Sequence, residues 1–471
     1  MQVAYPDKFV DSNADNYIKL SDRIWGYAEL GFSEFDSSAA HVEYLEKAGF
    51  EIKRGIAGMP TAFVAEAGSG GPVVGILGEF DALSGLSQES GALVCRTSTE
   101  IANGNGHGCG HHLLGTSAHL AAVAVKSFLE TSGMPGRVRF YGCPAEEGGY
   151  GKTFMVRDGL FNDVDAALTW HPGIANQVIN LNLLAVKQVY FRFKGVAAHA
   201  GVSPHLGRSA LDALELMNVG VNFLREHIVP EARLHYAIIN AGGTAPNVVQ
   251  ANTEVLYTIR APRNRVVDEI YERVEAIAKG AAMMTGCTVD TRFDSACSNI
   301  LLNTPLNELM YKHLQRLGAP DYELSEHSFA DAIHQTTHRE ERELAGRMLT
   351  AAWRDPKPLF DAVDRYDPAS AITMHGSTDV GDVSWVTPTA QCATACFAFG
   401  SSPHSWQWVS QGKSSIAHKG MLLAAKTIAA TAIDLFRDPS HIEAARAELV
   451  ARRDGDEYSS PVPDGVQPVR R

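Results

Sequence analysis

Four short segments of this 471-residue sequence carry side chains of the types that bind metal ions. The first is a glycine-rich stretch, residues 104–112, in which Cys109 and His111 are two positions apart. Glycine lets a backbone turn tightly, and a thiolate and an imidazole that converge from one turn are normal ligands of zinc-like cations. Taken alone, such a stretch is more often a glycine-rich turn that contains histidines by coincidence.

The second segment holds two adjacent carboxylates, Glu146 and Glu147, directly after the apolar stretch 138–141. In extended backbone, neighbouring side chains point to opposite sides, so one carboxylate can face a metal while the other faces a water. We assign Glu147 as a ligand and Glu146 as the general base, because a cation lowers the pKa of a water and a free carboxylate takes its proton. Two solvated glutamates in a loop are the alternative.

The third and fourth segments each place a histidine after an expected strand, His171 in one and His404 in the other. A lone histidine in this position is more often a structural residue. Four such segments, all expected at the carboxyl ends of strands, instead favour one shared site, because ligands of open α/β sheets gather at that edge. The set predicts a metal-dependent hydrolase.

The elements that must position these residues alternate between helices and short apolar strands. Residues 14–50 predict two helices and residues 113–129 a long third one. Buried strands are expected at residues 62–65, 73–77, 138–141 and 166–169. This alternation indicates an α/β domain with a mixed, mainly parallel sheet flanked by helices.

From about residue 187 the pattern changes to β-α-β-β-α-β, which is the order of a ferredoxin-like unit. We therefore predict an inserted lid domain at residues 187–298, and a catalytic domain that is split into residues 1–186 and 299–453. The tail, residues 454–471, is polar and contains prolines, so we expect it to be disordered.

Composition and competing motifs exclude several other classes of protein. A net charge of −13 argues against a nucleic-acid partner, which clustered Lys and Arg would bind. We find neither a secretory signal nor an apolar run long enough to span a membrane, and the odd number of cysteines, seven, fits a reducing cytoplasm. Residues 412–414 resemble the end of a phosphate loop, but Gln407 stands where such a loop needs glycine.

Together the motifs resemble the dinuclear peptidases that include aminoacylases and glutamate carboxypeptidases, in the branch of the indole-acetyl-amino-acid amidohydrolases. The resemblance covers nearly the whole chain. It rests on Cys-Gly-His at 109–111, Pro-Ala-Glu-Glu at 144–147, the segments around His171 and His404, and the lid segments 195–200 and 242–247.

The resemblance implies two divalent ions, manganese or zinc, in the catalytic domain. Their ligands would be Cys109, His111, Glu147, His171 and His404. It also implies that Glu146 activates the attacking water and that Asp81 orients a ligand from behind. Many members have Asp where this chain has His112, so we leave open whether His112 shapes a substrate-binding pocket for the leaving group.

The lid is implied to form dimers and to supply three further residues. His199 would reach the site of the partner subunit and polarise the scissile carbonyl, although a buried structural histidine is the alternative. Asn247 and Arg260 would hold a substrate carboxylate, Arg260 because the shape of its guanidinium matches that group.

The expected activity is hydrolysis of the amide bond of an N-acyl or N-aroyl amino acid. Segments 170–173 and 376–385 most resemble the branch that hydrolyses p-aminobenzoyl-glutamate, and this resemblance implies that compound, cleaved to p-aminobenzoate and glutamate, as the first substrate to test. Indole-acyl-amino acids and dipeptides are alternatives, and so is a non-catalytic role in a hetero-oligomer. We expect a cytoplasmic homodimer or higher oligomer, or a complex with a paralogous subunit, and no membrane or nucleic-acid partner.

Overall fold

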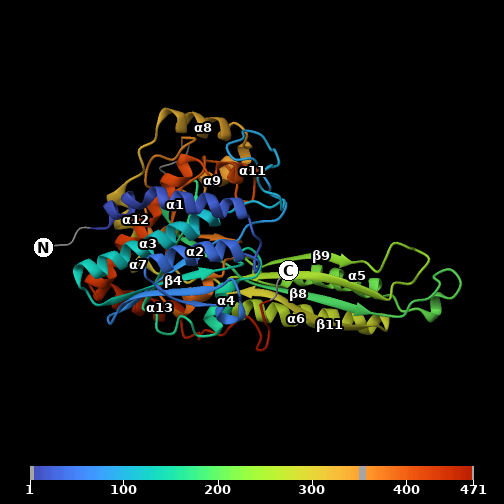
Figure 1. Ribbon diagram of the computed structural model, residues 1–471. Helices are drawn as coiled ribbons and strands as arrows, with labels where there is room; N and C mark the ends of the chain where they lie inside the picture. Colours follow the sequence, from blue (N-terminus) through green and yellow to red (C-terminus); the bar gives the residue numbers. More distant parts are fainter. Residues whose placement is uncertain (1–4, 350–356, 469–471) are drawn as a thin grey trace.

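A computed structural model describes residues 5–349 and 357–468 of the chain. These residues form a large body around one mixed sheet and a long arm around a second, smaller sheet (Figure 1). The amino-terminal end lies on the side of the body away from the arm, and the carboxyl-terminal end lies where body and arm meet.

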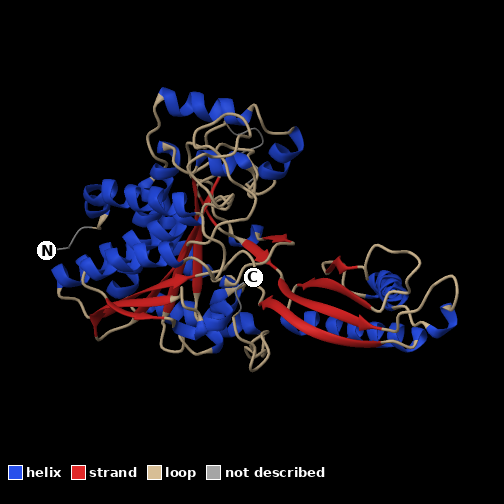
Figure 2. Ribbon diagram, turned by 45° about the vertical axis from the view of Figure 1, so that its right-hand side comes forward, coloured by secondary structure: helices blue, strands red, loops and turns tan. Residues whose placement is uncertain are grey.

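The sheet of the body has seven strands among the described residues, in the order β1-β2-β4-β3-β5-β13-β6 (Figure 2). Its centre is parallel, because β4, β3, β5 and β13 run in one direction, while β1, β2 and β6 pair antiparallel with their neighbours. The strands are β1 (Glu51–Arg54), β2 (Phe63–Ser69), β3 (Val73–Glu79), β4 (Gly136–Cys143), β5 (Ala166–Gly173), β6 (Gln177–Val178) and β13 (Thr389–Ala395). Strand β3 is buried along its whole length, as is usual for a parallel strand covered on both faces. The predicted mixed α/β sheet is confirmed.

Helices cover both faces of this sheet because successive strand residues point to opposite sides. Val74 and Ile76 of β3 join a core with α1 (Asp7–Tyr27), α3 (His111–Ser132) and α12 (Ser415–Arg437). Val73 and Leu77 join the opposite core, with α4 (Gly151–Arg157) and α10 (Val380–Val386). The remaining elements of the body are α2 (Phe35–Lys47), α7 (Thr304–Leu317), α8 (Leu324–His334), α9 (Arg339–Gly346), α11 (Trp406–Gln411), α13 (Ser440–Arg453) and the parallel pair β7 (Leu181–Leu183) and β12 (Ile372–Met374).

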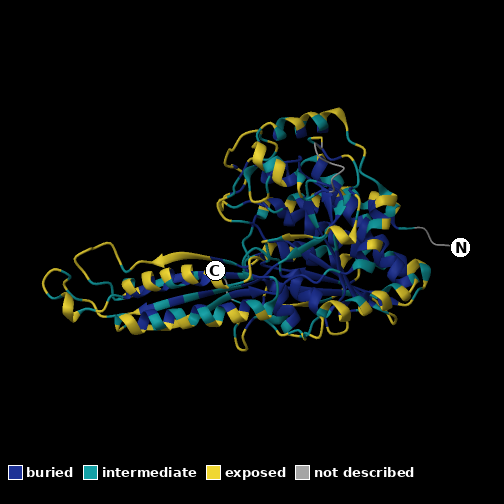
Figure 3. Cartoon of the chain, turned by 180° about the vertical axis from the view of Figure 1, so that it is seen from behind, coloured by how far each residue is buried: buried dark blue, intermediate teal, exposed yellow. Residues whose placement is uncertain are grey.

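The arm is a four-stranded antiparallel sheet in the order β11-β8-β10-β9, packed against two helices. Along the chain its elements are β8 (Ala185–Lys194), α5 (Ala210–Leu224), β9 (Arg233–Asn240), β10 (Asn252–Ala261), α6 (Asn264–Thr285) and β11 (Thr288–Cys297). This is the expected ferredoxin-like order, and the arm has a hydrophobic core of its own. Its helices and the loops at its tip present an exposed surface (Figure 3). We keep residues 187–298 as the proposed extent of the lid, with residues 1–186 and 299–453 as the proposed catalytic domain.

The tail differs from the expected disorder over the residues that the structure describes, 454–468. Tyr458 donates a hydrogen bond of 2.9 Å from its hydroxyl to Asp382, and Val462 is buried against the body. The prediction considered only the polarity of the tail and not the two apolar side chains that anchor it. Among the described residues, no helix has the length and apolar character needed to cross a membrane.

Candidate metal centre

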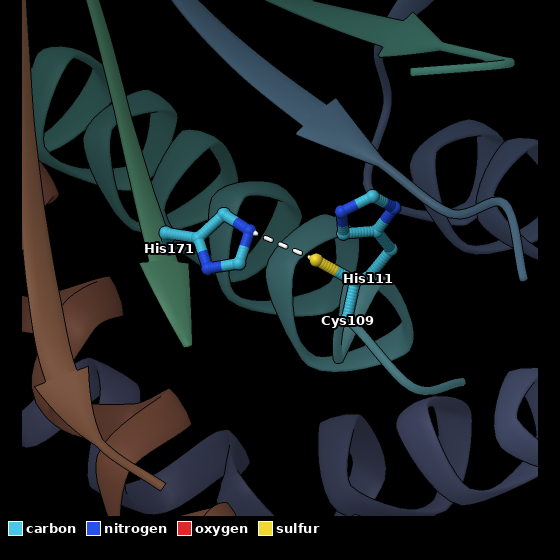
Figure 4. A group of neighbouring side chains, drawn as sticks. All are labelled: Cys109, His111 and His171. Carbon is cyan, nitrogen blue, oxygen red and sulfur yellow. Dashed lines mark hydrogen bonds between the residues drawn. The ribbon is translucent and has the colours of Figure 1, made fainter. Parts of the chain in front are cut away.

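Cys109 and His111 are brought together by the turn that begins α3. Gly110, between them, has a φ of 78°, a backbone conformation that favours glycine. A Cβ at this position would lie 3.1 Å from Pro172 and Phe397, so the turn packs closely against the end of β5. Figure 4 shows the sulfur of Cys109 between the rings of His111 and His171, which comes from that strand.

The imidazole of His171 faces the thiol of Cys109. Its Nδ1 donates a hydrogen bond of 2.8 Å to the carbonyl oxygen of Pro172, and its Nε2 lies 3.4 Å from the Cys109 Sγ. A hydrogen bond at one ring nitrogen fixes the tautomer and leaves the lone pair of the other nitrogen for a metal. His171 is therefore oriented as a ligand in advance.

Glu146 and Glu147 lie in a turn, not in the extended backbone that we expected. Ala145, the preceding residue, has a φ of 57°, and its N–H donates a hydrogen bond of 2.8 Å to the buried carboxylate of Glu34. The two glutamates still face different neighbours. Glu147 lies beside Cys109, whereas Glu146 has Glu79 and His111 nearby.

His404 approaches Glu147 from the opposite side of the site. Its Nε2 lies 3.2 Å from Glu147 Oε1, and its side chain is 52% exposed. Its backbone N–H donates a hydrogen bond of 2.8 Å to the carbonyl oxygen of Gly108. We expected all four segments to follow strands directly. The glutamate pair follows β4 and His171 lies near the end of β5, but Cys109 and His404 lie in turns that precede α3 and α11.

Asp81 joins two of these segments with one buried carboxylate. Its Oδ1 lies 2.8 Å from His111 Nδ1, and its Oδ2 accepts a hydrogen bond of 2.9 Å from the backbone N–H of Glu147. The first contact leaves His111 Nε2 to face the site. Asp81 thus has the position expected of a residue that orients ligands.

The side chains of the site can form two ligand groups that share one thiolate. Possible ligand atoms of Cys109, His111 and His171 lie within 4.8 Å of one another, and so do those of Cys109, Glu147 and His404. Two buried atoms of this set, His111 Nε2 and Glu147 Oε1, make no well-formed hydrogen bond among the described residues, and lie 3.3 Å from Glu79 Oε2 and 3.2 Å from His404 Nε2 respectively. Buried polar atoms normally have partners. The set of sulfur, nitrogen and oxygen donors therefore suits cations of the zinc class.

The two glutamates have different electrostatic surroundings. Burial, together with the negative charges of Glu79 and Glu147, raises the pKa of Glu146 well above its ordinary value. Burial acts in the same direction on Glu147, but the contact with His404 and the charge of His111 lower its pKa to about 2. A basic carboxylate suits proton transfer near neutral pH, and an ionised one suits metal binding.

Three charged residues beside the site were not among those predicted from sequence. Lys152 is fully buried between Glu79 and Asp379. Its Nζ lies 2.6 Å from Glu79 Oε1 and 2.6 Å from Asp379 Oδ1. Glu79 Oε2 in turn lies 3.3 Å from His111 Nε2. In the sequence, each of these residues stands out only as a charged residue within an apolar or glycine-rich stretch. Such a position does not reveal which opposite charge the residue will contact.

His112 lies behind the site, in the interior of the body. Its ring is fully buried, its Nε2 donates 2.9 Å to the carbonyl of Gly412, and its centroid is 4.8 Å from that of His107. The ring packs in the interior of the body in this structure, and the role of His112 in substrate binding stays a prediction.

The three predicted lid residues lie at two separate places within one chain, His199 and Asn247 together and Arg260 apart from them. His199 and Asn247 are exposed neighbours at the tip of the arm, where the Ala200 N–H donates 2.9 Å to the Asn247 carbonyl. Arg260 lies near the other end of β10, where its guanidinium donates 2.6 Å to the hydroxyl of Ser377. At roughly 3.3 Å per residue of strand, β10 separates tip from base by about 26 Å. One chain therefore cannot bring Asn247 and Arg260 to the same carboxylate.

Known proteins resemble this chain along almost all of its length. Residues 75–395 match Peptidase family M20/M25/M40. One of the subunits of the p-aminobenzoyl-glutamate hydrolase of Escherichia coli (strain K12) is 49% identical, over 98% of each chain. The Xaa-Arg dipeptidase of Mus musculus is 28% identical, over 93% of this chain and 90% of that protein. A dinuclear metal-binding peptidase of Bacillus subtilis shares the fold, with a TM-score of 0.57 and 16% identity over 91% of this chain and 99% of its own.

Proposed function

Since the chain belongs to peptidase family M20/M25/M40, and is therefore a metal-dependent hydrolase of amide bonds, we propose that it cleaves p-aminobenzoyl-glutamate to p-aminobenzoate and glutamate. The observation that supports this substrate most directly is the 49% identity, over 98% of each chain, to a subunit of a hydrolase named for it. The general base and the complete ligand set speak against a non-catalytic subunit, which would have no use for them.

The proposed metal ligands are Cys109, His111, Glu147, His171 and His404. Because Cys109 belongs to both ligand groups, it would contribute to holding two divalent ions, which we propose to be manganese or zinc. When bound, two such cations polarise the scissile carbonyl and lower the pKa of the attacking water.

Glu146 is the proposed general base. Its raised pKa suits it to take a proton from the attacking water and to return that proton to the leaving nitrogen. Asp81 keeps His111 and the backbone of Glu147 in place, so the ligands do not have to reorganise during the reaction.

His199 is the proposed donor to the carbonyl oxygen, acting in the site of a partner chain. Its Nδ1 accepts hydrogen bonds from the N–H groups of Gly201 (3.2 Å) and Val202 (3.1 Å). This arrangement puts the ring proton on Nε2, which is free to donate to a developing oxyanion. Within its own chain, the tip of the arm points away from the body.

An edge of the arm provides the proposed interface for a second chain. Strand β9 is an edge strand that exposes Tyr236, Ile238 and Ile239, and the neighbouring α5 exposes Val219 and Phe223. Unpaired backbone beside exposed apolar side chains is typical of a surface that pairs with another chain. We propose a homodimer, or a pair with a paralogous subunit, since the hydrolase of Escherichia coli has two differently named subunits that both resemble this chain.

In such a dimer Asn247 of one chain and Arg260 of the other can contact the same substrate. We propose that both hold the carboxylates of the glutamate moiety, Arg260 through its guanidinium. A dipeptide is the second candidate substrate, supported by the resemblance to the mouse dipeptidase.

The cytoplasm is the proposed location, because all seven cysteines are free thiols, as is usual in a reducing compartment.

A hydrolysis screen tests the proposal. The purified chain, loaded with manganese or zinc, is incubated with p-aminobenzoyl-glutamate, an indole-acetyl-amino acid and an Xaa-Arg dipeptide, and the released amino acid is quantified. We expect p-aminobenzoyl-glutamate to be cleaved with the highest kcat/KM, chelation to abolish the activity and metal to restore it. Preferred cleavage of another substrate would replace our choice, and activity that survives complete chelation would contradict the metal-dependent site.

A further inference from the structure

Lys152 is a fully buried ammonium group at the start of α4, five residues after Glu147. Its Nζ lies 2.6 Å from Glu79 Oε1 and 2.6 Å from Asp379 Oδ1. Its backbone N–H donates 2.8 Å to the second oxygen of Asp379. The ammonium group and the backbone N–H of Lys152 therefore join three segments of the body, those of Glu79, Lys152 and Asp379.

Glu79 connects this cation to the reacting groups. While Oε1 contacts Lys152, Oε2 lies 3.3 Å from His111 Nε2, and the possible ligand atoms of Glu79, His111 and Glu146 all lie within 4.8 Å of one another. Glu79, which is buried, and Glu146, which is half-buried, are thus two carboxylates at close range, which repel each other unless a cation is near.

The turn that carries Glu146 is held at both of its ends. Before it, the Ala145 N–H donates to Glu34. After it, Lys152 is bound by Asp379, and the Thr153 hydroxyl donates 2.7 Å to Asp382. Without Lys152 the second end would lose its charged contact, and Glu79 and Asp379 would be left as buried, uncompensated carboxylates, which is costly.

Lys152 also connects the base of the arm to the catalytic turn. Arg260 of β10 donates to Ser377, two residues before Asp379, which contacts Lys152. Burial disfavours the ammonium, but the charges of Asp379 and Glu79 keep the pKa of Lys152 well above its ordinary value. The ammonium of Lys152 is therefore charged between the two carboxylates, while burial raises the pKa of Asp379 to about 7.

We propose that Lys152 is a positioning residue for amide hydrolysis: by holding Glu79 and Asp379, it fixes the carboxylate of Glu146 beside the metal centre. This inference rests on the proposed function, in which Glu146 is the general base. Lys152 touches neither a proposed metal ligand nor the substrate, so its contribution belongs to kcat and not to metal binding or KM.

The first test compares Lys152→Met with Lys152→Gln in metal-loaded enzyme. We expect Lys152→Met to lower kcat by about tenfold or more, because small displacements of a catalytic group are costly. KM should stay within about twofold and metal content should be unchanged. Lys152→Gln should recover part of kcat, since its shorter, uncharged amide can still donate two hydrogen bonds. Wild-type kcat in both variants, or a change confined to KM, would overturn the proposal. If Lys152→Met is insoluble, wild-type kcat in Lys152→Gln overturns it by itself.

The second test separates positioning of Glu146 from general damage. In a Glu146→Gln background, Lys152→Met should lower the residual kcat by no more than about threefold, because a group that acts through Glu146 has little left to position. A tenfold loss in both backgrounds would show that the two residues act independently, and it would refute the inference.

A remote variant controls for loss of stability. Asp434→Asn removes another buried carboxylate that binds a lysine and a histidine, on α12 and away from the site. At temperatures equally far below each melting temperature, kcat of Asp434→Asn should match the wild type, and an equal loss in both variants would contradict a specific role of Lys152. The wild-type enzyme is assayed in parallel, so failure of the proposed function appears as an inactive wild type and failure of this inference as an active Lys152→Met.

Discussion

At the scale of residues, the division of work between Glu146 and Glu147 comes from their surroundings. The two side chains are chemically identical and adjacent. His404 and His111 favour the ionised form of Glu147, whereas burial near Glu79 makes Glu146 more basic. Neighbouring charges thus favour the proposed roles, metal binding for Glu147 and proton transfer for Glu146.

Substitution of each glutamate by glutamine tests this assignment. Glu146→Gln keeps the size of the side chain but removes the base, so kcat should fall at least about a hundredfold while metal content persists. Glu147→Gln should lower metal occupancy, because an amide oxygen is a weaker ligand than a carboxylate. For each variant, kcat is measured by steady-state kinetics and metal occupancy by elemental analysis of the same preparation. Loss of metal in Glu146→Gln with full occupancy in Glu147→Gln would reverse the two roles.

At the scale of elements, the packing of α2 on α3 depends on two buried histidines. His41 Nδ1 lies 3.2 Å from His119 Nδ1, and the rings are enclosed by Tyr17, Phe80 and Phe140. Burial lowers the pKa of His41 to about 3 and that of His119 well below its ordinary value. Only one proton fits between the two nitrogens, so the pair is neutral in the folded protein.

This pair predicts a pH dependence of stability. Above about pH 6.5 both histidines are neutral in the folded and in the unfolded chain, and their contribution is fully present. As the pH falls from about 6.5 towards 3, the unfolded chain binds protons that the folded chain excludes, so each histidine lowers the free energy of unfolding by up to about 1.4 kcal/mol per pH unit. A His41→Leu/His119→Leu variant should lose less stability than wild type between pH 7 and 5, measured by urea unfolding. Parallel pH profiles would contradict a neutral buried pair.

At the scale of the whole molecule, the arm separates residues that must act together. His199 follows β8 and Asn247 precedes β10, at the end of the arm away from the body, and the candidate metal ligands lie in the body. A rigid arm of this length delivers its tip to another chain more readily than to its own. The shape of the molecule therefore supports the proposed two-chain site, in which the exposed edge β9 pairs with a second chain.

Mixing two inactive variants tests the two-chain site. His199→Ala should lower kcat with little change in metal content, and Glu146→Gln should be inactive for want of a base. In a mixed dimer, one of the two sites combines Glu146 from the first chain with His199 from the second. Partial activity should therefore return on mixing. Mixtures that remain inactive, although subunit exchange is demonstrated by differently tagged chains, would show that His199 does not act across the interface.

Sequence alone determined the local features of this protein. The apolar strands, the Ala- and Leu-rich helix α3 and the βαββαβ order of the arm follow from patterns over a few residues, and the structure confirms them. The ligand types at Cys109, His111, Glu147, His171 and His404 were also visible, because their chemistry is a property of single side chains.

Only the tertiary structure decided which of these side chains meet, and which others join them. The contact of His404 with Glu147 joins positions 257 residues apart in the sequence, and the pairing of Lys152 with Asp379 joins positions 227 apart. The burial of His112 and the anchoring of the tail through Tyr458 likewise depend on distant partners. Short-range patterns follow from the geometry of the backbone, whereas the surroundings of a charge depend on packing between segments that are far apart in the chain.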